Sequence, residues 1–86
     1  MTVLFYGNAL RYTKDETSFV SQESDSIRAL FDELGGQFGE EFKAFLLGDE
    51  TCLILVNGKG LMTTGGFDTK LTPGDRVEIL PYVMAG

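Results

Sequence analysis

Side chains that could take part in chemistry are scarce in this chain. It has one cysteine, Cys52, and no histidine. These numbers exclude an intramolecular disulfide, a four-ligand zinc site and a cysteine-ligated iron–sulfur cluster within one chain. Cys52 heads an apolar segment and has no basic neighbour in sequence to stabilise a thiolate, so we expect it to be a small core residue.

The last six residues, PYVMAG, form a short and mostly apolar tail that ends on Gly86. Glycine has no β-carbon and is freer in φ and ψ than other residues. Taken alone, the tail is typical of a frayed terminus without function, which is the common fate of chain ends.

Size and charge restrict the class of protein. The chain has 86 residues and a net charge of −6, so we expect a single domain, residues 1–86, that repels nucleic acid and favours a basic partner. Its longest apolar run, residues 52–56, is too short to cross a bilayer, and its N-terminus lacks a signal-peptide pattern. We therefore expect a cytoplasmic protein without membrane contact.

The elements that must position the tail begin with three strands. Residues 2–7 are β-branched and aromatic, which predicts a strand inside a sheet. Residues 52–56 predict a buried strand that runs into Asn57-Gly58, the pair preferred in a type I′ hairpin turn. The last strand should begin at Arg76 and lead directly into the tail.

That last strand alternates between apolar and charged residues. Val77 and Ile79 should lie on one face, and Arg76 and Glu78 on a wetter face. Upstream of it, Gly65-Gly66 should break the return strand of the hairpin, and the segment 72–75 should form a type II turn. A weaker strand around Phe19 and Val20 should pair with the first strand as a hairpin.

Two helices are predicted between these strands. Ile27, Leu30, Phe31 and Leu34 have the spacing of one apolar helical face, with Ser24 or Asp25 as the N-cap and Gly35-Gly36 as the stop. A shorter helix should run from Glu40 to Leu47 and end at Gly48. The chain is thus α+β, with both helices on one face of a mixed sheet of four to five strands and the other face partly open.

Three stretches together resemble the MoaD/ThiS family of sulfur carriers, most closely the small subunit of molybdopterin synthase. They are VLFYGNALRY (3–12), LVNGK (55–59) and GGFDTKLTPGDRVEILPYVMAG (65–86). The resemblance implies a ubiquitin-like β-grasp fold in which residues 82–86 are a reactive C-terminal tail. The chain length and the helix at 40–47 favour the molybdopterin branch over the thiamine branch.

The resemblance also implies a reaction at the C-terminus. In the family, a ubiquitin-activating-type adenylyltransferase, MoeB/ThiF-like, uses ATP to adenylate the terminal carboxylate, and a persulfide sulfur then replaces AMP. Here the reactive group would be the carboxylate of Gly86. The chain would bind no cofactor and supply no catalytic residue, and it would donate sulfur to a MoaE-like large catalytic subunit for molybdenum or tungsten cofactor biosynthesis.

The residues expected to contact these partners lie in the tail and on the last strand. They are Val77, Ile79, Pro81, Tyr82, Val83, Met84 and Ala85. The family's usual ending is Pro-Pro-x-x-Gly-Gly, so Tyr82 replaces the second proline and Ala85 replaces the penultimate glycine. Three explanations fit Ala85: the activating partner accepts its methyl group, the natural product continues by another glycine, or the carrier chemistry has been lost.

Two other functions remain open. The chain could be a degenerate β-grasp interaction module or accessory subunit that docks through its sheet and never reacts. It could also be a ubiquitin-like modifier that is conjugated to lysines through the same activated terminus.

Overall fold

The computed structural model describes residues 1–21, 23–48 and 52–81. Five strands form one mixed sheet in the order β2-β1-β5-β3-β4. In chain order the strands are β1 (Thr2–Phe5), β2 (Ser18–Val20), β3 (Cys52–Val56), β4 (Lys59–Gly60) and β5 (Arg76–Pro81). The helices are η1 (Gly7–Arg11), α1 (Ile27–Phe38), α2 (Glu40–Leu47), α3 (Leu61–Thr64) and η2 (Gly66–Asp68), of which η1 and η2 are 3₁₀ helices.

The first and last strands, β1 and β5, lie side by side near the sheet centre. β1 and β5 are parallel, with Val3 opposite Val77 and Phe5 opposite Ile79. β5 also pairs with β3 in the antiparallel direction, so it is hydrogen-bonded on both sides. The expected hairpin between β1 and β2 is confirmed.

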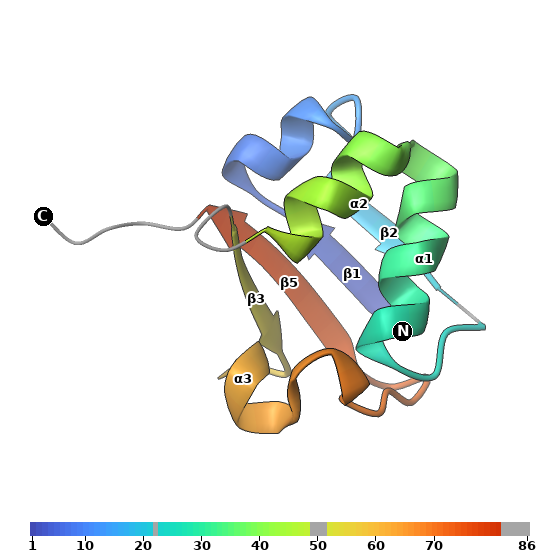
Figure 1. The fold of residues 1–86 in the computed structure, drawn as a ribbon, viewed down its shortest axis with the longest axis vertical. Helices are drawn as coiled ribbons and strands as arrows, with labels where there is room; N and C mark the ends of the chain where they lie inside the picture. The colour runs from blue at the N-terminus through green and yellow to red at the C-terminus, as the bar shows by residue number, and fades with distance from the viewer. Residues whose placement is uncertain (22, 49–51, 82–86) are drawn as a thin grey trace, which may run out of the picture.

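One face of this sheet carries the core. Figure 1 shows α1 and α2 lying across that face, and α1 packs against α2. The expectation that both helices share one face is confirmed. The fully buried side chains between the sheet and the helices include Val3, Phe5, Val77 and Ile79 from the strands and Ile27, Leu30, Phe31, Leu34 and Phe42 from the helices.

α1 begins and ends later than the sequence indicates. Its N-cap is Ser26, whose Oγ accepts a hydrogen bond from the backbone N–H of Ala29 at 3.1 Å, rather than Ser24 or Asp25. The predicted stop at Gly35-Gly36 is wrong, because the helix continues to Phe38 and the residue with positive φ is Gly39, at +111°.

Gly35 has a packing role instead. An ideal β-carbon on Gly35 would lie 3.1 Å from Cβ of Lys43, so the missing side chain lets α2 approach α1 closely. α2 itself spans the predicted residues Glu40–Leu47 and ends at Gly48.

The segment after β3 differs from the prediction in two places. The turn at Asn57-Gly58 has positive φ at both residues, +52° and +83°, as a type I′ turn requires. The return strand β4 covers only two residues, however, because α3 replaces the expected longer strand. The turn before β5 is closed by Asp75 N–H and Thr72 O at 3.0 Å, but Gly74 lacks the positive φ of the predicted type II turn.

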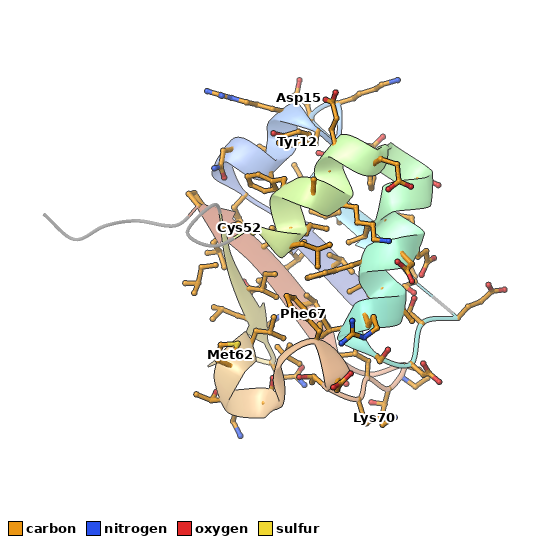
Figure 2. All side chains as sticks on the ribbon, in the orientation of Figure 1. Tyr12, Asp15, Cys52, Met62, Phe67 and Lys70 are labelled. Carbon is orange, nitrogen blue, oxygen red and sulfur yellow. The ribbon has the colours of Figure 1, made fainter. Side chains whose placement is uncertain are left out.

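No sequence pattern predicts η1, which follows β1 and packs against β5. Ala9 of η1 is fully buried. Tyr12, just after η1, stacks on Phe42 of α2 with ring centroids 5.6 Å apart, and lies 4.9 Å from the ring of Phe45 (Figure 2). η1 is therefore attached both to the sheet and to α2.

Candidate functional site

The predicted reactive segment starts where β5 ends. Pro81 is the last residue of β5 and is half-buried, opposite Cys52 of β3. The remaining predicted tail contacts, Tyr82, Val83, Met84 and Ala85, and the predicted reactive residue Gly86 lie outside the described residues.

Two of the residues that were predicted to contact a partner are buried in the core. Val77 and Ile79 are both fully buried, because their side chains point toward the helices. They hold β5 in the core and offer no surface to a partner. The expectation that they form a docking face is therefore corrected.

The open face of the sheet is formed by the alternate residues. According to the strand register, this face carries Leu4, Tyr6, Leu53, Leu55, Glu78 and Leu80. The side chains of Tyr6 and Leu53 are 40% and 43% exposed, which makes them available for contact. A mainly apolar surface thus borders the last three residues of β5, beside the start of the tail.

The two charged side chains of β5 on this face, Arg76 and Glu78, are linked to each other. Glu78 accepts a hydrogen bond from the hydroxyl of Tyr6 at 3.4 Å and forms an ion pair with Arg76, whose Nε lies 3.4 Å from Glu78 Oε1. Because each charge has an opposite charge or a donor nearby, a partner could cover this face without leaving an isolated buried charge.

The chain at the start of the tail is held on two sides. The backbone N–H of Tyr6 donates to Ile79 O at 2.9 Å, which extends the β1–β5 pairing by one bond. Gly7, the next residue, has a φ of +60° and its Cα faces the Pro81 ring. Pro81 therefore lies between β3 and the segment that joins β1 to η1.

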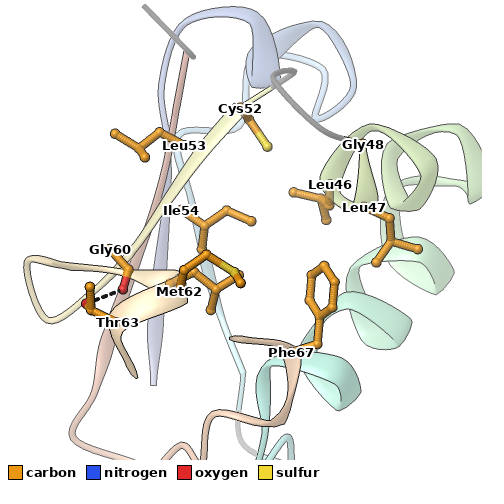
Figure 3. Close-up of a pocket in the computed structure, with 11 residues that line it drawn as sticks. Leu46, Leu47, Gly48, Cys52, Leu53, Ile54, Gly60, Met62, Thr63 and Phe67 are labelled. Carbon is orange, nitrogen blue, oxygen red and sulfur yellow. Dashed lines mark hydrogen bonds between the residues drawn. The ribbon is translucent and has the colours of Figure 1, made fainter. Parts of the chain in front are cut away.

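A groove of about 320 Å³ lies on the other side of β3, between that strand, the end of α2 and α3. Figure 3 shows Leu47 and Phe67 facing Ile54 and Met62 across it. Cys52 also lines the groove and is half-buried, with Sγ 3.9 Å from Phe45 O. The expectation of a core cysteine is thus only partly met.

The other end of the sheet holds a polar network that involves two motif residues. Asn57 Nδ2 donates to Asp75 Oδ1 at 3.0 Å, and the backbone N–H of Thr72 donates to Asp75 Oδ2 at 2.8 Å. These hydrogen bonds hold the pKa of Asp75 below its ordinary value, and the bond from Asn57 has the largest effect. Asn57 and Asp75 thus stabilise the turns at the two ends of this network.

Within residues 1–21, 23–48 and 52–81, no group of three potential metal ligands of the histidine, cysteine, aspartate or glutamate type lies together. None of the helices in this part of the chain is long and apolar enough to span a membrane.

Known proteins with similar sequences and folds match nearly the whole chain. The model of the ThiS family matches residues 3–86. No curated protein matches the sequence significantly.

Sixteen solved chains are similar to this one, among them two CysO proteins and a putative molybdopterin converting factor subunit. CysO from Mycobacterium tuberculosis has a TM-score of 0.82 and 26% identity over 95% of this chain and 98% of that chain. CysO from Amycolatopsis orientalis, solved in complex with BexX, has a TM-score of 0.80 and 25% identity over 99% of this chain and 98% of that chain. A putative molybdopterin converting factor subunit 1 from Pyrococcus furiosus has a TM-score of 0.72 and 27% identity over 95% of each chain. The five-stranded mixed sheet with its helices is the ubiquitin-like β-grasp fold of these neighbours, which confirms the predicted fold.

Proposed function

Because this chain belongs to the ThiS family, we propose that it is a sulfur carrier that forms a thiocarboxylate at Gly86. The observation that carries this proposal is the extent of the family match, which runs through the tail to residue 86. A chain that kept only a β-grasp body would match the family over the sheet and helices and need not match over the tail.

The proposed reaction begins with a carboxylate, which is a poor electrophile because its charge and resonance repel nucleophiles. Adenylation by ATP converts the Gly86 carboxylate to a mixed anhydride and releases pyrophosphate. A persulfide sulfur on a partner attacks the acyl carbon and displaces AMP, and a thiol then cleaves the S–S bond to leave the thiocarboxylate. Since the partners supply ATP binding and catalysis, this chain needs no base and no cofactor of its own.

The body of the domain acts as the handle in this reaction. The open sheet face beside Pro81, with Leu53, Leu80 and Tyr6, offers an apolar surface of the kind found at the centre of protein interfaces. The net charge of −6 steers a basic partner toward the domain. The similarity to CysO in its complex with BexX supports a protein partner.

We place the carrier in molybdopterin synthesis, with a MoeB/ThiF-like adenylyltransferase as the activating partner and a MoaE-like large subunit as the recipient, in the cytoplasm. The similarity to the putative molybdopterin converting factor subunit 1 supports this choice, and so does the presence of α2 at Glu40–Leu47. In this role Ala85 is accepted by the activating partner, because alanine can adopt the extended backbone that a channel requires.

The test is the intact mass of the protein after incubation with ATP, a persulfide donor and the activating enzyme of the same organism. We expect a mass gain equal to the replacement of one oxygen by sulfur, absent from a variant that lacks Gly86. Ala85→Gly should gain the same mass at an equal or higher rate. No gain, with an enzyme shown to activate a carrier that ends in Gly-Gly, would leave the chain as a docking module.

The destination of the sulfur needs a second measurement. The thiocarboxylated protein is mixed with the MoaE-like subunit and the cofactor precursor, and the loss of the added sulfur mass is followed. Return of the carrier to its carboxylate mass supports the molybdopterin role. Retention of sulfur, while a control carrier is consumed, would assign this chain to another recipient.

A further inference from the structure

Gly7 and Pro81 are separated by almost the whole chain, yet they are in direct contact. An ideal β-carbon on Gly7 would lie 2.2 Å from Pro81 Cγ and 2.9 Å from Cδ, distances that real β-carbons essentially never show. Gly7 also has a φ of +60°, which L-residues with side chains rarely adopt. Two independent features therefore require glycine at this position.

The backbone around Gly7 is held by contacts on both sides, which oppose its movement away from the proline ring. Tyr6 N–H donates to Ile79 O at 2.9 Å on one side of Gly7. On the other side, Ala9 is fully buried and Tyr12 stacks on Phe42. Gly7 thus lies in a segment that is packed on both sides and is not part of a free loop.

Pro81 is held from its other side as well. It pairs with Cys52 of β3, and its pyrrolidine ring restricts its own φ to about −65°. Pro81, the last residue of β5, is therefore held between β3 and the segment at Gly7. The five residues 82–86 begin from this point.

We propose that Gly7 is a positioning residue for the reaction at Gly86. Its missing side chain seats the Pro81 ring, and the seated ring directs the tail toward the active site of the docked partner. This inference rests on the proposed function, because it assigns Gly7 a role in the reaction that occurs at the tail. The body still docks through the open sheet face, which Gly7 does not form.

The test compares Gly7→Ala with a control variant in which alanine is placed at a similar positive φ. Gly66 has a φ of +66°, and its nearest neighbour for an added β-carbon is Met62 Sδ at 4.0 Å, so Gly66→Ala adds strain without a clash. For Gly7→Ala we expect kcat for thiocarboxylate formation to fall about tenfold or more. KM for the carrier should stay within about twofold, because docking is unchanged.

A rescue experiment shows whether the effect passes through the proline. Replacing Pro81 by alanine removes Cγ and Cδ, and only Cβ remains, at 3.3 Å from the added carbon. Gly7→Ala combined with Pro81→Ala should therefore have the same kcat as Pro81→Ala alone. The proposal is overturned if kcat of the double variant is lower than that of Pro81→Ala by the same factor by which Gly7→Ala lowers kcat of the wild type. It is also overturned if Gly7→Ala and Gly66→Ala have the same kcat.

An NMR measurement separates this inference from the proposed function. The wild type should show nuclear Overhauser contacts between the Gly7 α-protons and the Pro81 ring protons. Gly7→Ala should lose the close packing and change the residual dipolar couplings of the Leu80 and Tyr6 amides, whereas Gly66→Ala should not. Unchanged couplings would refute the seating of Pro81 by Gly7, even if the wild type forms a thiocarboxylate. Altered couplings in Gly7→Ala, together with a wild type that forms no thiocarboxylate, would instead refute the proposed function.

Discussion

The side-chain amide of Asn57 donates a hydrogen bond to Asp75 Oδ1 at 3.0 Å, and so joins the β3–β4 turn to the turn before β5. The Asn57 side chain also accepts from Arg76 N–H at 2.9 Å, while its backbone N–H donates to Arg76 O at 2.8 Å. Two sequence motifs that mark the family are thus a single structural unit. It fixes the start of β5, and the tail leaves from the opposite end of that strand.

Loss of this unit should lower stability without a specific effect on carrier chemistry. Asp75→Ala removes the acceptor of two hydrogen bonds, so we expect the free energy of unfolding to fall by about 1–2 kcal/mol. Urea denaturation measures it. The control is Asp68→Asn at the exposed ion pair with Arg28, where the change should stay within about 0.5 kcal/mol. Equal losses in both variants would contradict the assignment.

The same carboxylate should make stability depend on pH. Hydrogen bonds lower the pKa of Asp75 in the folded protein, so its contribution is complete above the unfolded pKa and is lost as the pH falls through the folded value. Urea midpoints between about pH 6 and pH 2 should show this loss. The difference between wild type and Asp75→Asn should shrink toward low pH. A constant difference would argue against a pKa shift at Asp75.

The two adjacent glycines of α1 should respond differently to alanine. Gly36 is helical and exposed, and no atom lies within 4 Å of an added β-carbon, so Gly36→Ala should raise the free energy of unfolding by about 0.5–1 kcal/mol. Gly35→Ala should gain less, because its β-carbon meets Lys43 at 3.1 Å. Thermal denaturation of both variants tests this order. Destabilisation by Gly36→Ala would indicate that the helix stops there after all.

The open sheet face should contribute to partner binding near the tail and little at its far end. Leu53→Asp places a charge on an apolar surface beside Pro81, so we expect the Kd for the activating enzyme to rise about tenfold or more. The matched control is Val20→Asp, on the same face but opposite Thr2 at the start of β1, where Kd should hardly change. Titration calorimetry measures both Kd values, and equal losses would contradict a docking face centred on Leu53 and Leu80.

Much of the architecture is determined locally and could be predicted. The spacing of Ile27, Leu30 and Leu34 requires one apolar helical face, and Asn57-Gly58 requires a tight turn, whatever the remainder of the chain does. The resemblance across the last third of the sequence likewise identified the family, which the family match confirms. The reactive role of Gly86 stays a prediction.

What the sequence could not determine depends on contacts between distant segments. The face of β5 opposite Val77 and Ile79 carries the apolar Leu80 as well as charged residues. The alternation along β5 therefore shows that the strand has two faces, but it does not show which face the helices cover. A glycine pair inside a helix, Gly35-Gly36, looks like a stop until the close approach of α2 is known.

The contact of Gly7 with Pro81 is another case that only the tertiary structure decides. No local pattern links these two residues, because the contact arises from the parallel pairing of the first strand with the last. The sequence by itself therefore determined the main strands, the two longer helices, the family and the candidate reactive end. The tertiary structure decided which face of the sheet is open and that Pro81 packs against Gly7, since both depend on contacts between segments that are distant in the sequence.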